Sequence, residues 1–461
     1  MQDINFLSRI TISKSKMSNC RITSYVKPIF QTPKDACYWF GYYNYDPINL
    51  DGKKLLCNRA EFDATPIVRG MTIDVGFFDL TTKEWQPIGK TDSFNWQQGA
   101  MLQWIPTNGI EDRLIYNCSH DGHIISKIHD INTGKIKELD YPIYGITPDG
   151  KKSISLNMER AYWCRGYHYQ SVSNPNYDVD VAEDDGIYEI DLEANSCRRI
   201  ISIEEVINLD YDPSFEKAKH WLEHVMISPD GARFCFLHRF SLGDIFQYET
   251  RLFVANIDGC DLQVVDGWRQ YRWSHFGWGH NGSFVIYAYK KNTTSPIKTS
   301  SVSNVKRHGM KEIVKSAYHH FAPLTMQMYL QQKKAVGTRF YQYYELENKT
   351  FVKKEEWGGI DFCIDGHPSF TSDDQFMLTD SYPDWRDIQK LIVFDKKNKN
   401  SLTIGRFKDA LTRKPGSCDL HPKLSRSCNK VTIDTAYDGK HHVIVFNLEW
   451  EKIKSAISNV K

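Results

Sequence analysis

The stretch MISPDGARFCFLH, residues 226–238, joins a tight turn to a strand-like run and recurs in altered form along the chain. At its centre, Ser228-Pro229-Asp230-Gly231 favours a hairpin, because proline presets the first turn position and glycine tolerates a positive φ. The apolar run 234–237 that follows is typical of a buried strand. Related turns lie at 50–53, 106–112, 147–150, 280–282, 371–374 and 425–429. This recurrence indicates a repeat architecture.

A second signal, an apolar run that closes in a polar turn, alternates strictly with the first. Its copies lie at 75–81, 125–133, 186–193, 250–258, 340–348, 390–397 and 442–449. Each repeat unit therefore contains two hairpins, which make four strands. Seven such units predict an all-β fold, a seven-bladed β-propeller of four-stranded antiparallel blades. A two-sheet sandwich is the alternative, but it does not explain the alternation.

The repeat also predicts the domain organisation of the 461 residues. Residues 1–30 form an N-terminal extension, 31–450 the propeller and 451–461 a C-terminal tail. Two segments exceed the repeat and predict insertions, at about 157–185 in blade three and 290–334 in blade five. We expect the first to overhang the channel and the second, which is basic, to be peripheral.

The composition excludes several partners. Lys and Arg total 58, Asp and Glu 57, and the net charge is +1, so no global field attracts nucleic acid or an anionic membrane. The sequence has neither a signal-peptide core nor an apolar run long enough to span a bilayer. Its 11 cysteines include no C-x-x-C pair. We therefore expect a cytoplasmic protein with reduced thiols, a monomer or weak homo-oligomer.

Four consecutive blades carry a histidine at one repeat position, six residues before the first hairpin turn. These residues are His224, His275, His367 and His421, and blade one has Tyr45 at the same offset. Equivalent positions in a propeller share height and radius, so the pattern predicts an arc of imidazoles at one end of the channel. Imidazole binds divalent transition metals and titrates near neutral pH. The arc could hold a metal, transfer protons or do both; an inherited packing role is the alternative.

Other candidate residues cluster near the same end of the channel. Asp419 precedes His421 by two residues on the same strand, so it points to the same side and could add a carboxylate ligand. His238 and Arg239 end the second strand of blade four. The histidines that lie near turns or on outer strands are expected at the surface. They are His120, His123, His129, His441 and His442.

Two aromatic- and amide-rich segments lead into blades one and two: 39–46 (WFGYYNYD) and 95–104 (NWQQGAMLQW). Aromatic faces stack on sugar rings, and amides hydrogen-bond to hydroxyl groups. The sequence therefore predicts a sugar-binding role for four side chains, with blade-to-blade packing as the alternative. They are Tyr43, Tyr45, Trp96 and Gln98.

Three stretches resemble blade signatures of the oligogalacturonate lyases and, more loosely, of the TolB-type propellers. They are 274–278 (SHFGW), 366–374 (GHPSFTSDD) and 418–423 (CDLHPK). The resemblance implies a cytoplasmic seven-bladed propeller that cleaves uronic-acid oligosaccharides by β-elimination and uses manganese.

The resemblance also implies roles for individual residues. Among the family's metal ligands, one histidine corresponds to His275 and another to His421, while Asp419 stands where the family has a histidine. The family's glutamine ligand falls at Gly416, which has no side chain to coordinate, and His367 is a candidate replacement. The catalytic histidine corresponds to His238. The catalytic arginine has no clean counterpart, and Arg239 is only a neighbour.

The resulting hypothesis is a metal-assisted lyase that acts on uronic-acid-containing oligosaccharides. A divalent metal, Mn²⁺, would bind His275, His421 and Asp419, with His367 as second choice. His238 or His224 would exchange the proton. Arg239, or Arg165 from the blade-three insertion, would pair with a second uronate carboxylate.

Two alternatives belong to other functional classes. One is a non-catalytic propeller that binds a glycan or a protein through the same face. The other is a glycoside hydrolase, which needs a pair of carboxylates flanking the scissile bond. Asp46, Asp380 and Asp419 are the candidates for such a pair.

Overall fold

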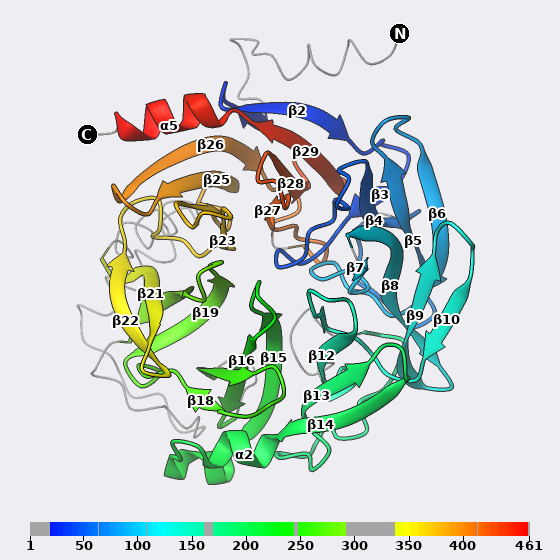
Figure 1. Ribbon diagram of the computed structural model, residues 1–461, viewed down its shortest axis with the longest axis vertical. Coiled ribbons are helices and arrows are strands. Elements are labelled where there is room, and N and C mark those ends of the chain that lie inside the picture. The colour runs from blue at the N-terminus through cyan, green and yellow to red at the C-terminus, as the bar shows by residue number, and fades with distance from the viewer. Residues whose placement is uncertain are drawn as a thin grey trace, which may run out of the picture.

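The protein is a seven-bladed β-propeller, which confirms the predicted fold class. Its computed structural model describes residues 19–62, 64–107, 109–160, 169–243, 248–291, 337–412 and 414–459. Seven antiparallel sheets surround a central axis (Figure 1). Arg165 and nearly all of the predicted blade-five insertion lie outside the described residues.

Five blades are built in sequence order from four strands each. Blade one contains β3 (Cys37–Trp39), β4 (Lys54–Ala60), β5 (Ile73–Asp79) and β6 (Trp85–Thr91). Blade two contains β7 (Gln103–Thr107), β8 (Ile110–His120), β9 (His123–Asp130) and β10 (Ile136–Leu139). Blade three contains β11 (Gly145–Ile146), β12 (Lys152–Leu156), β13 (Gly186–Asp191) and β14 (Ser196–Ser202). Blade four contains β15 (Lys219–Ile227), β16 (Arg233–Ser241), β17 (Glu249–Asn256) and β18 (Gln263–Val264). Blade five contains β19 (Tyr271–Trp278), β20 (Phe284–Lys290), β21 (Arg339–Glu347) and β22 (Thr350–Trp357).

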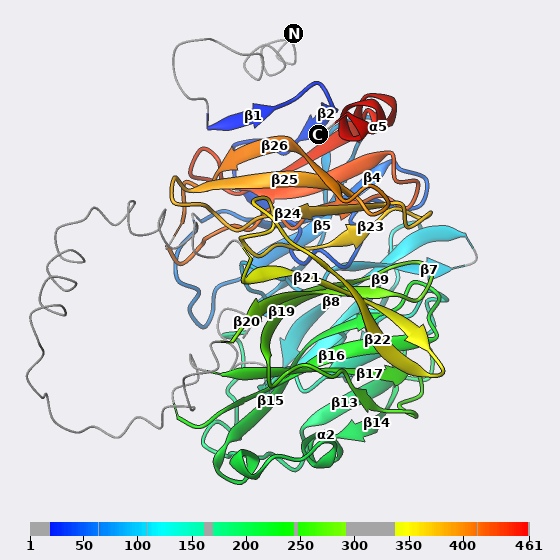
Figure 2. The same cartoon turned by 90° about the vertical axis from the view of Figure 1, so that its left-hand side faces the viewer.

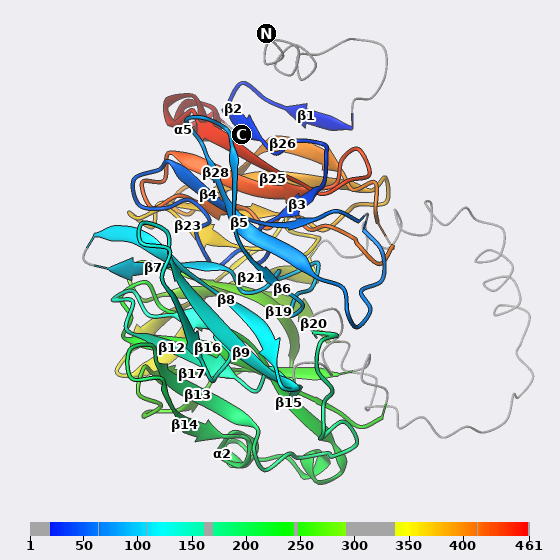
Figure 3. The ribbon, with the colours of Figure 1, turned by 90° about the vertical axis from the view of Figure 1, so that its right-hand side faces the viewer.

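The last two blades take strands from both ends of the chain. Blade six contains β23 (Ser369–Phe370), β24 (Phe376–Asp380), β25 (Ile388–Asp395) and β26 (Asn400–Lys408), and β1 (Cys20–Ile22) adds a fifth strand. Blade seven contains β27 (Lys423–Leu424), β28 (Lys430–Thr435) and β29 (His442–Leu448), and its outer strand is β2 (Val26–Gln31). Figures 2 and 3 show β1 beside β26 at this edge.

The ring of blades is closed by residues that the sequence analysis assigned to an N-terminal extension and a C-terminal tail. The pairing of β2 with β29 completes the four-stranded sheet of blade seven from both ends of the chain and locks the ring. Helix α5 (Trp450–Ser458) follows, and its Ile453 and Ile457 are buried in the core shared by blades six and seven. A short helix, α2 (Ile203–Asn208), and a 3₁₀ turn, η2 (Pro213–Lys217), connect blades three and four.

The core lies between successive blades, so each inner strand is buried on both faces. In β16, Phe234 and Phe236 pack toward blade three, whereas Cys235 and Leu237 pack toward blade five. This explains why the run is continuously apolar rather than alternating. Among the residues that the structure describes, no helix is both long enough and apolar enough to cross a membrane.

Candidate metal centre and its histidine arc

The four equivalent histidines meet near the propeller axis. The ring centroids of His275 and His367 lie 4.2 Å apart, those of His367 and His421 4.3 Å, and those of His224 and His275 6.2 Å. All four side chains are buried. The common offset therefore places imidazoles from blades four to seven in one cluster, which we call the histidine arc.

Local backbone irregularities aim these side chains. His224 and His275 lie where the register of the inner strand shifts, between Glu223 and Met226 and between Trp273 and Phe276. Such bulges commonly redirect a side chain. His224 and His421 also have positive φ angles of 57° and 42°, which non-glycine residues rarely adopt.

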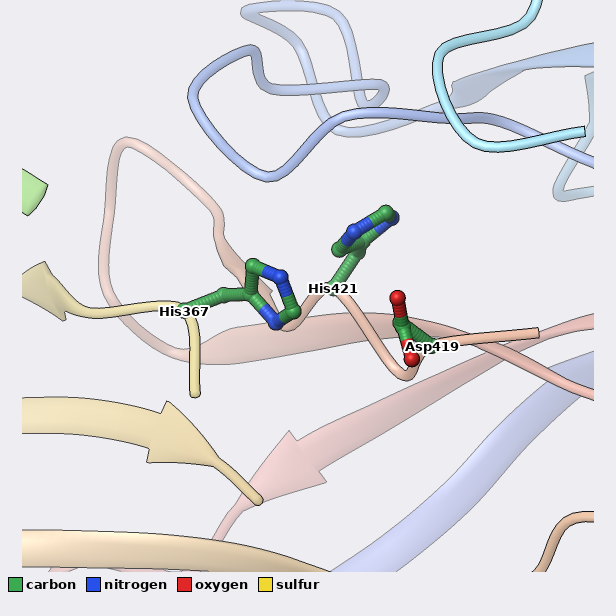
Figure 4. A group of neighbouring side chains, drawn as sticks. All are labelled: His367, Asp419 and His421. Carbon is green, nitrogen blue, oxygen red and sulfur yellow. The ribbon is translucent and has the colours of Figure 1, made fainter. Parts of the chain in front are cut away.

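His367, Asp419 and His421 form a compact group in which one ligand atom from each residue lies within 4.8 Å of the others. Figure 4 shows the three side chains gathered beside the segments that lead into β23 and β27. Two imidazoles and a carboxylate suit a divalent first-row metal ion.

The hydrogen bonds of this group leave ring nitrogens available as ligands. His421 Nδ1 donates to the carbonyl of Gly41 over 3.0 Å, so its Nε2 carries the lone pair. His367 Nδ1 lies 2.9 Å from Asp380 Oδ1. Among the described residues, His367 Nε2 is buried and has no hydrogen-bond partner. An unpaired buried nitrogen is costly, and a bound cation would satisfy it.

Burial raises the pKa of Asp380, whose carboxyl group shares a proton with His367, to about 7. Asp380 Oδ1 accepts the backbone N–H of His367, and Oδ2 accepts that of His421. Because each carboxylate oxygen already accepts a hydrogen bond, we place the shared proton on His367 Nδ1. This arrangement orients the ring as second-layer carboxylates do around metals.

The electrostatics of the group also fit a cation. Burial lowers the pKa values of His367 and His421 well below the usual range, and the neighbouring imidazoles add to the effect. Both rings are therefore neutral, as metal ligation requires. Burial raises the pKa of Asp419 well above its usual range, and the carboxylates of Asp380 and Asp409 raise it further. A cation would relieve this repulsion.

His275, the ligand that the sequence ranked first, lies beside this group rather than in it. Its Nδ1 lies 3.2 Å from Asp365 Oδ1, and its Nε2 lies 3.4 Å from the hydroxyl of Tyr382. His367, ranked second, belongs to the compact group. The reason is position in the ring: Asp419 is on blade seven, one blade from His367 and two blades from His275.

His224 has a different hydrogen-bond pattern. Its Nδ1 lies 2.7 Å from the hydroxyl of Tyr42, and its Nε2 lies 3.4 Å from Glu223 Oε2. The contact between Nε2 and Glu223 is an ion-pair contact rather than a hydrogen bond, whereas the hydroxyl of Tyr42 is a hydrogen-bond partner of the ring. Arg239 Nη1 lies 2.7 Å from the same oxygen of Glu223, and Trp221 donates to its Oε1.

Arg239 thus reaches the arc through Glu223. Sequence reasoning missed both Glu223 and Tyr42. Two signals could have indicated them: Glu223 adjoins an arc histidine, and Tyr42 lies in the aromatic segment 39–46.

The structure places His238 in a different cluster. Its Nε2 lies 2.9 Å from His220 Nδ1, and its Nδ1 lies 3.4 Å from Arg251. Its ring stacks on His220 with centroids 5.1 Å apart and is fully buried. Both ring nitrogens are therefore engaged away from the arc. His238 belongs to β16, the second strand of its blade, whereas the arc forms at the innermost strands.

The four side chains predicted to bind sugar make hydrogen bonds within the protein. Tyr43 donates to the carbonyl of Phe276, and Tyr45 donates to that of Tyr144. The remaining two bonds run from Trp96 to the carbonyl of Thr65 and from Gln98 to the hydroxyl of Tyr144. These contacts correspond to the packing alternative, in which the segments join neighbouring blades.

The predicted surface histidines divide into two groups. The side chains of His120 and His123 are 65% and 75% exposed. The prediction is wrong for His129, His441 and His442, which are buried. His441, for example, packs against Trp96 with ring centroids 4.8 Å apart. Ring closure buries these residues, and local sequence does not reveal that.

Gly416 is too crowded for the glutamine that the resemblance would place there. An added Cβ would lie 2.1 Å from the Cβ of Ala64. The position therefore departs sterically, as well as chemically, from the ligand pattern implied by the resemblance.

Comparisons with known proteins show the fold. No family model matches the sequence, and no curated protein matches it. Similar solved structures include an oligogalacturonate lyase from Vibrio parahaemolyticus, with a TM-score of 0.56 and 15% identity over 92% of this chain and 93% of that one. Another is an oligogalacturonate lyase in complex with manganese, with a TM-score of 0.58 and 16% identity over 93% of this chain and 94% of that one.

A further match is TolB from Acinetobacter baumannii, with a TM-score of 0.36 and 11% identity over 83% of this chain and 78% of that one, too low to support an argument. The predicted resemblance is confirmed at the level of the seven-bladed fold.

Proposed function

We propose that this protein is a lyase that cleaves uronic-acid-containing oligosaccharides by metal-assisted β-elimination. The observation that carries the proposal is the buried group of His367, Asp419 and His421, whose ligand atoms converge within 4.8 Å. A manganese complex of an oligogalacturonate lyase with a similar fold supports the choice of chemistry.

His367, Asp419 and His421 would hold the divalent metal, for which we propose Mn²⁺. When bound, the metal supplies a Lewis acid that neutralises the uronate carboxylate and makes the adjacent C5 proton acidic. Asp380 and the carbonyl of Gly41 orient the two imidazoles through their Nδ1–H groups.

The hydrogen-bonded pair of Tyr42 and His224 would move the proton. Burial and Arg239 lower the pKa of His224 well below its usual range, so the ring is neutral and able to accept a proton. In the reaction the C5–H bond breaks, its electron pair forms the C4–C5 double bond, and the C4–O bond breaks. The proton passes through the pair to the leaving oxygen, so the step balances without another reactant.

Glu223 would stabilise the imidazolium that forms on His224, because its Oε2 lies 3.4 Å from Nε2 of that ring. Arg239 and Trp221 hold Glu223 in place. We therefore assign Arg239 to Glu223 rather than to a second uronate carboxylate. His238, whose ring nitrogens are already engaged, has no part in this proposal.

The deep burial of the arc supports a second candidate, a non-catalytic propeller that binds a glycan or a protein. A hydrolase has less support. Asp46 accepts backbone N–H groups of Ile48 and Arg426, and both oxygens of Asp380 accept hydrogen bonds near the arc.

The proposal is tested by elemental analysis of the purified protein beside a His367→Ala/His421→Ala variant. We expect stoichiometric manganese or another divalent metal in the first and none in the second. The metal-loaded protein should then generate an ultraviolet-absorbing unsaturated product from uronic-acid oligosaccharides. Full metal content in the variant would overturn the ligand assignment, and metal binding without product would favour the binding-module candidate.

A further inference from the structure

We infer that residues 40–43, a segment of blade one that we call the crossing segment, orient histidines that belong to blades four and seven and set the tautomer of His421 in blade seven. This inference rests on the proposed function, because it concerns how the metal-binding and proton-transferring imidazoles are held. It assigns a positioning role to Gly41, which hydrogen-bonds to His421, and to Asp434, which accepts the backbone N–H of Gly41.

Three consecutive residues of the crossing segment reach three different blades. The carbonyl of Gly41 accepts from His421 Nδ1 at 3.0 Å, in blade seven. The hydroxyl of Tyr42 lies 2.7 Å from His224 Nδ1, in blade four, and the two rings stack with centroids 5.2 Å apart. The hydroxyl of Tyr43 donates to the carbonyl of Phe276 in blade five at 2.6 Å.

Tyr43 also packs against the arc. Its ring centroid lies 4.9 Å from that of His367 and 6.1 Å from those of His275 and His421. The crossing segment therefore contacts every histidine of the arc, either by a hydrogen bond or by ring packing.

A buried ion pair holds the crossing segment. Asp434 Oδ1 accepts the backbone N–H of Phe40 at 2.9 Å, and its Oδ2 accepts that of Gly41 at 3.1 Å. The ammonium group of Lys423 lies 3.0 Å from Asp434 Oδ2 and 5.1 Å from the Phe40 ring centroid. Both charged side chains are at most 3% exposed, so the loss of one would leave the other buried without its partner.

Gly41 is required by the path of the backbone. Its φ angle is +121°, and an added Cβ would lie 2.6 Å from the backbone carbon and oxygen of Gln98. Alanine at this position would have to push the crossing segment away from blade two. The carbonyl that holds His421 would move with it.

The chemical consequence concerns how each ring is held. Gly41 keeps the proton of His421 on Nδ1 and leaves Nε2 for the metal, whereas the hydroxyl of Tyr42 orients the ring of His224 through Nδ1. Groups that orient metal ligands in this way typically change metal affinity by about 10- to 100-fold when they are removed.

The test measures Mn²⁺ binding to the full-length protein by titration calorimetry for Asp434→Asn and Gly41→Ala. Asp185→Asn and Gly359→Ala are matched controls. Asp185 is a buried carboxylate 3.8 Å from a buried arginine in blade three. Gly359 has a φ of +117° with no atom within 4 Å of an added Cβ. We expect affinity to fall about 10- to 100-fold in the test variants and to stay unchanged in the controls.

A second readout does not depend on the metal. The ¹⁵N signals of the His421 ring in metal-free protein, assigned with His421→Gln, should show a proton on Nδ1 in the wild type and a mixture of tautomers in both test variants. If Gly41→Ala fails to fold, Asp434→Asn decides alone.

The outcomes separate the two claims. If Asp434→Asn keeps both the wild-type Mn²⁺ affinity and the wild-type His421 tautomer, the inference is overturned and the proposed metal site stands. If the wild type binds no Mn²⁺, the proposed function fails, and the ring signals still decide whether the crossing segment positions His421.

Discussion

Two histidine clusters both draw on blade four but have opposite surroundings. The histidine arc joins residues on, or just before, the innermost strands of blades four to seven, and its ring nitrogens face carboxylates, a carbonyl and a hydroxyl group. The second cluster, which we call the stacked pair, consists of His220 and His238 in blade four. These two rings bond to each other and lie beside the guanidinium group of Arg251.

The difference shows that the partners of an imidazole, rather than its presence, decide what it can do. In the compact group of His367, Asp419 and His421, hydrogen-bond acceptors hold the Nδ1 protons of the two histidines. Their Nε2 lone pairs are then available to a metal ion. In the stacked pair, His220 also bonds through Nε2 to the carbonyl of Phe215 in η2, so the ring nitrogens of the pair are engaged within the protein. A cation would also be repelled there by Arg251.

The largest expected effect separates the clusters by metal affinity. His367→Ala/His421→Ala should weaken Mn²⁺ binding by about 1,000-fold or more, which is about 4 kcal/mol, because it removes two of three ligands. His220→Ala/His238→Ala should leave binding unchanged. Titration calorimetry of the two double variants measures this contrast, and equal losses in both would remove the distinction between the clusters.

We expect the stacked pair to contribute to the stability of the protein rather than to metal binding. His238→Ala removes a fully buried ring that contacts Phe215, Phe240 and Phe253 and leaves His220 Nδ1 without its partner. We expect the free energy of unfolding to fall by about 2–4 kcal/mol. Urea denaturation at neutral pH measures the loss. A variant as stable as the wild type would show that the stacked pair has no structural role.

The pH dependence of stability sharpens the same contrast. Burial lowers the pKa values of His220 and His238, and nearby Arg251 lowers them further. The unfolded rings titrate near 6.5, so between that pH and the lower folded pKa the unfolded state binds more protons. Stability is therefore complete above about pH 6.5 and falls as the solution becomes more acidic, by at most about 1.4 kcal/mol per pH unit for each ring.

Denaturation of wild type and His238→Leu at several pH values between neutral and moderately acidic checks this prediction. The decline should be shallower in the variant, because one titrating ring is absent. Other buried histidines, including His129 and His441, contribute equally to both proteins. Parallel pH curves would contradict the assignment.

The smallest effect is expected at an exposed histidine. The side chain of His123 is 75% exposed, and its contact is with Glu159 at 3.1 Å. His123→Ala should change the free energy of unfolding by less than about 0.5 kcal/mol and leave Mn²⁺ affinity unchanged. A loss comparable to that of His238→Ala would mean that burial does not distinguish the histidines.

Much of the candidate site was predictable because its residues share a repeat position. The turn chemistry of Ser228–Gly231 and its counterparts fixed the spacing of the inner strands, and the offset then placed His224, His275, His367 and His421 at one radius. Asp419 was predicted from strand alternation beside His421, but the two residues lie just before β27, and His421 has a φ of 42°, so alternation is not what brings them together. The role of His238 was not predictable, since its pairing with His220 depends on side-chain directions within the blade.

By itself, the sequence determined the number of blades, the strand order in most of them and the histidine positions. These follow from local backbone preferences and hydrophobic periodicity, which act over a few residues. Only the tertiary structure decided that β2 completes blade seven and that Gly41 binds His421, 380 positions away. Such contacts form when the ring closes and brings chain segments from both ends together, and no local pattern encodes which side chains then meet.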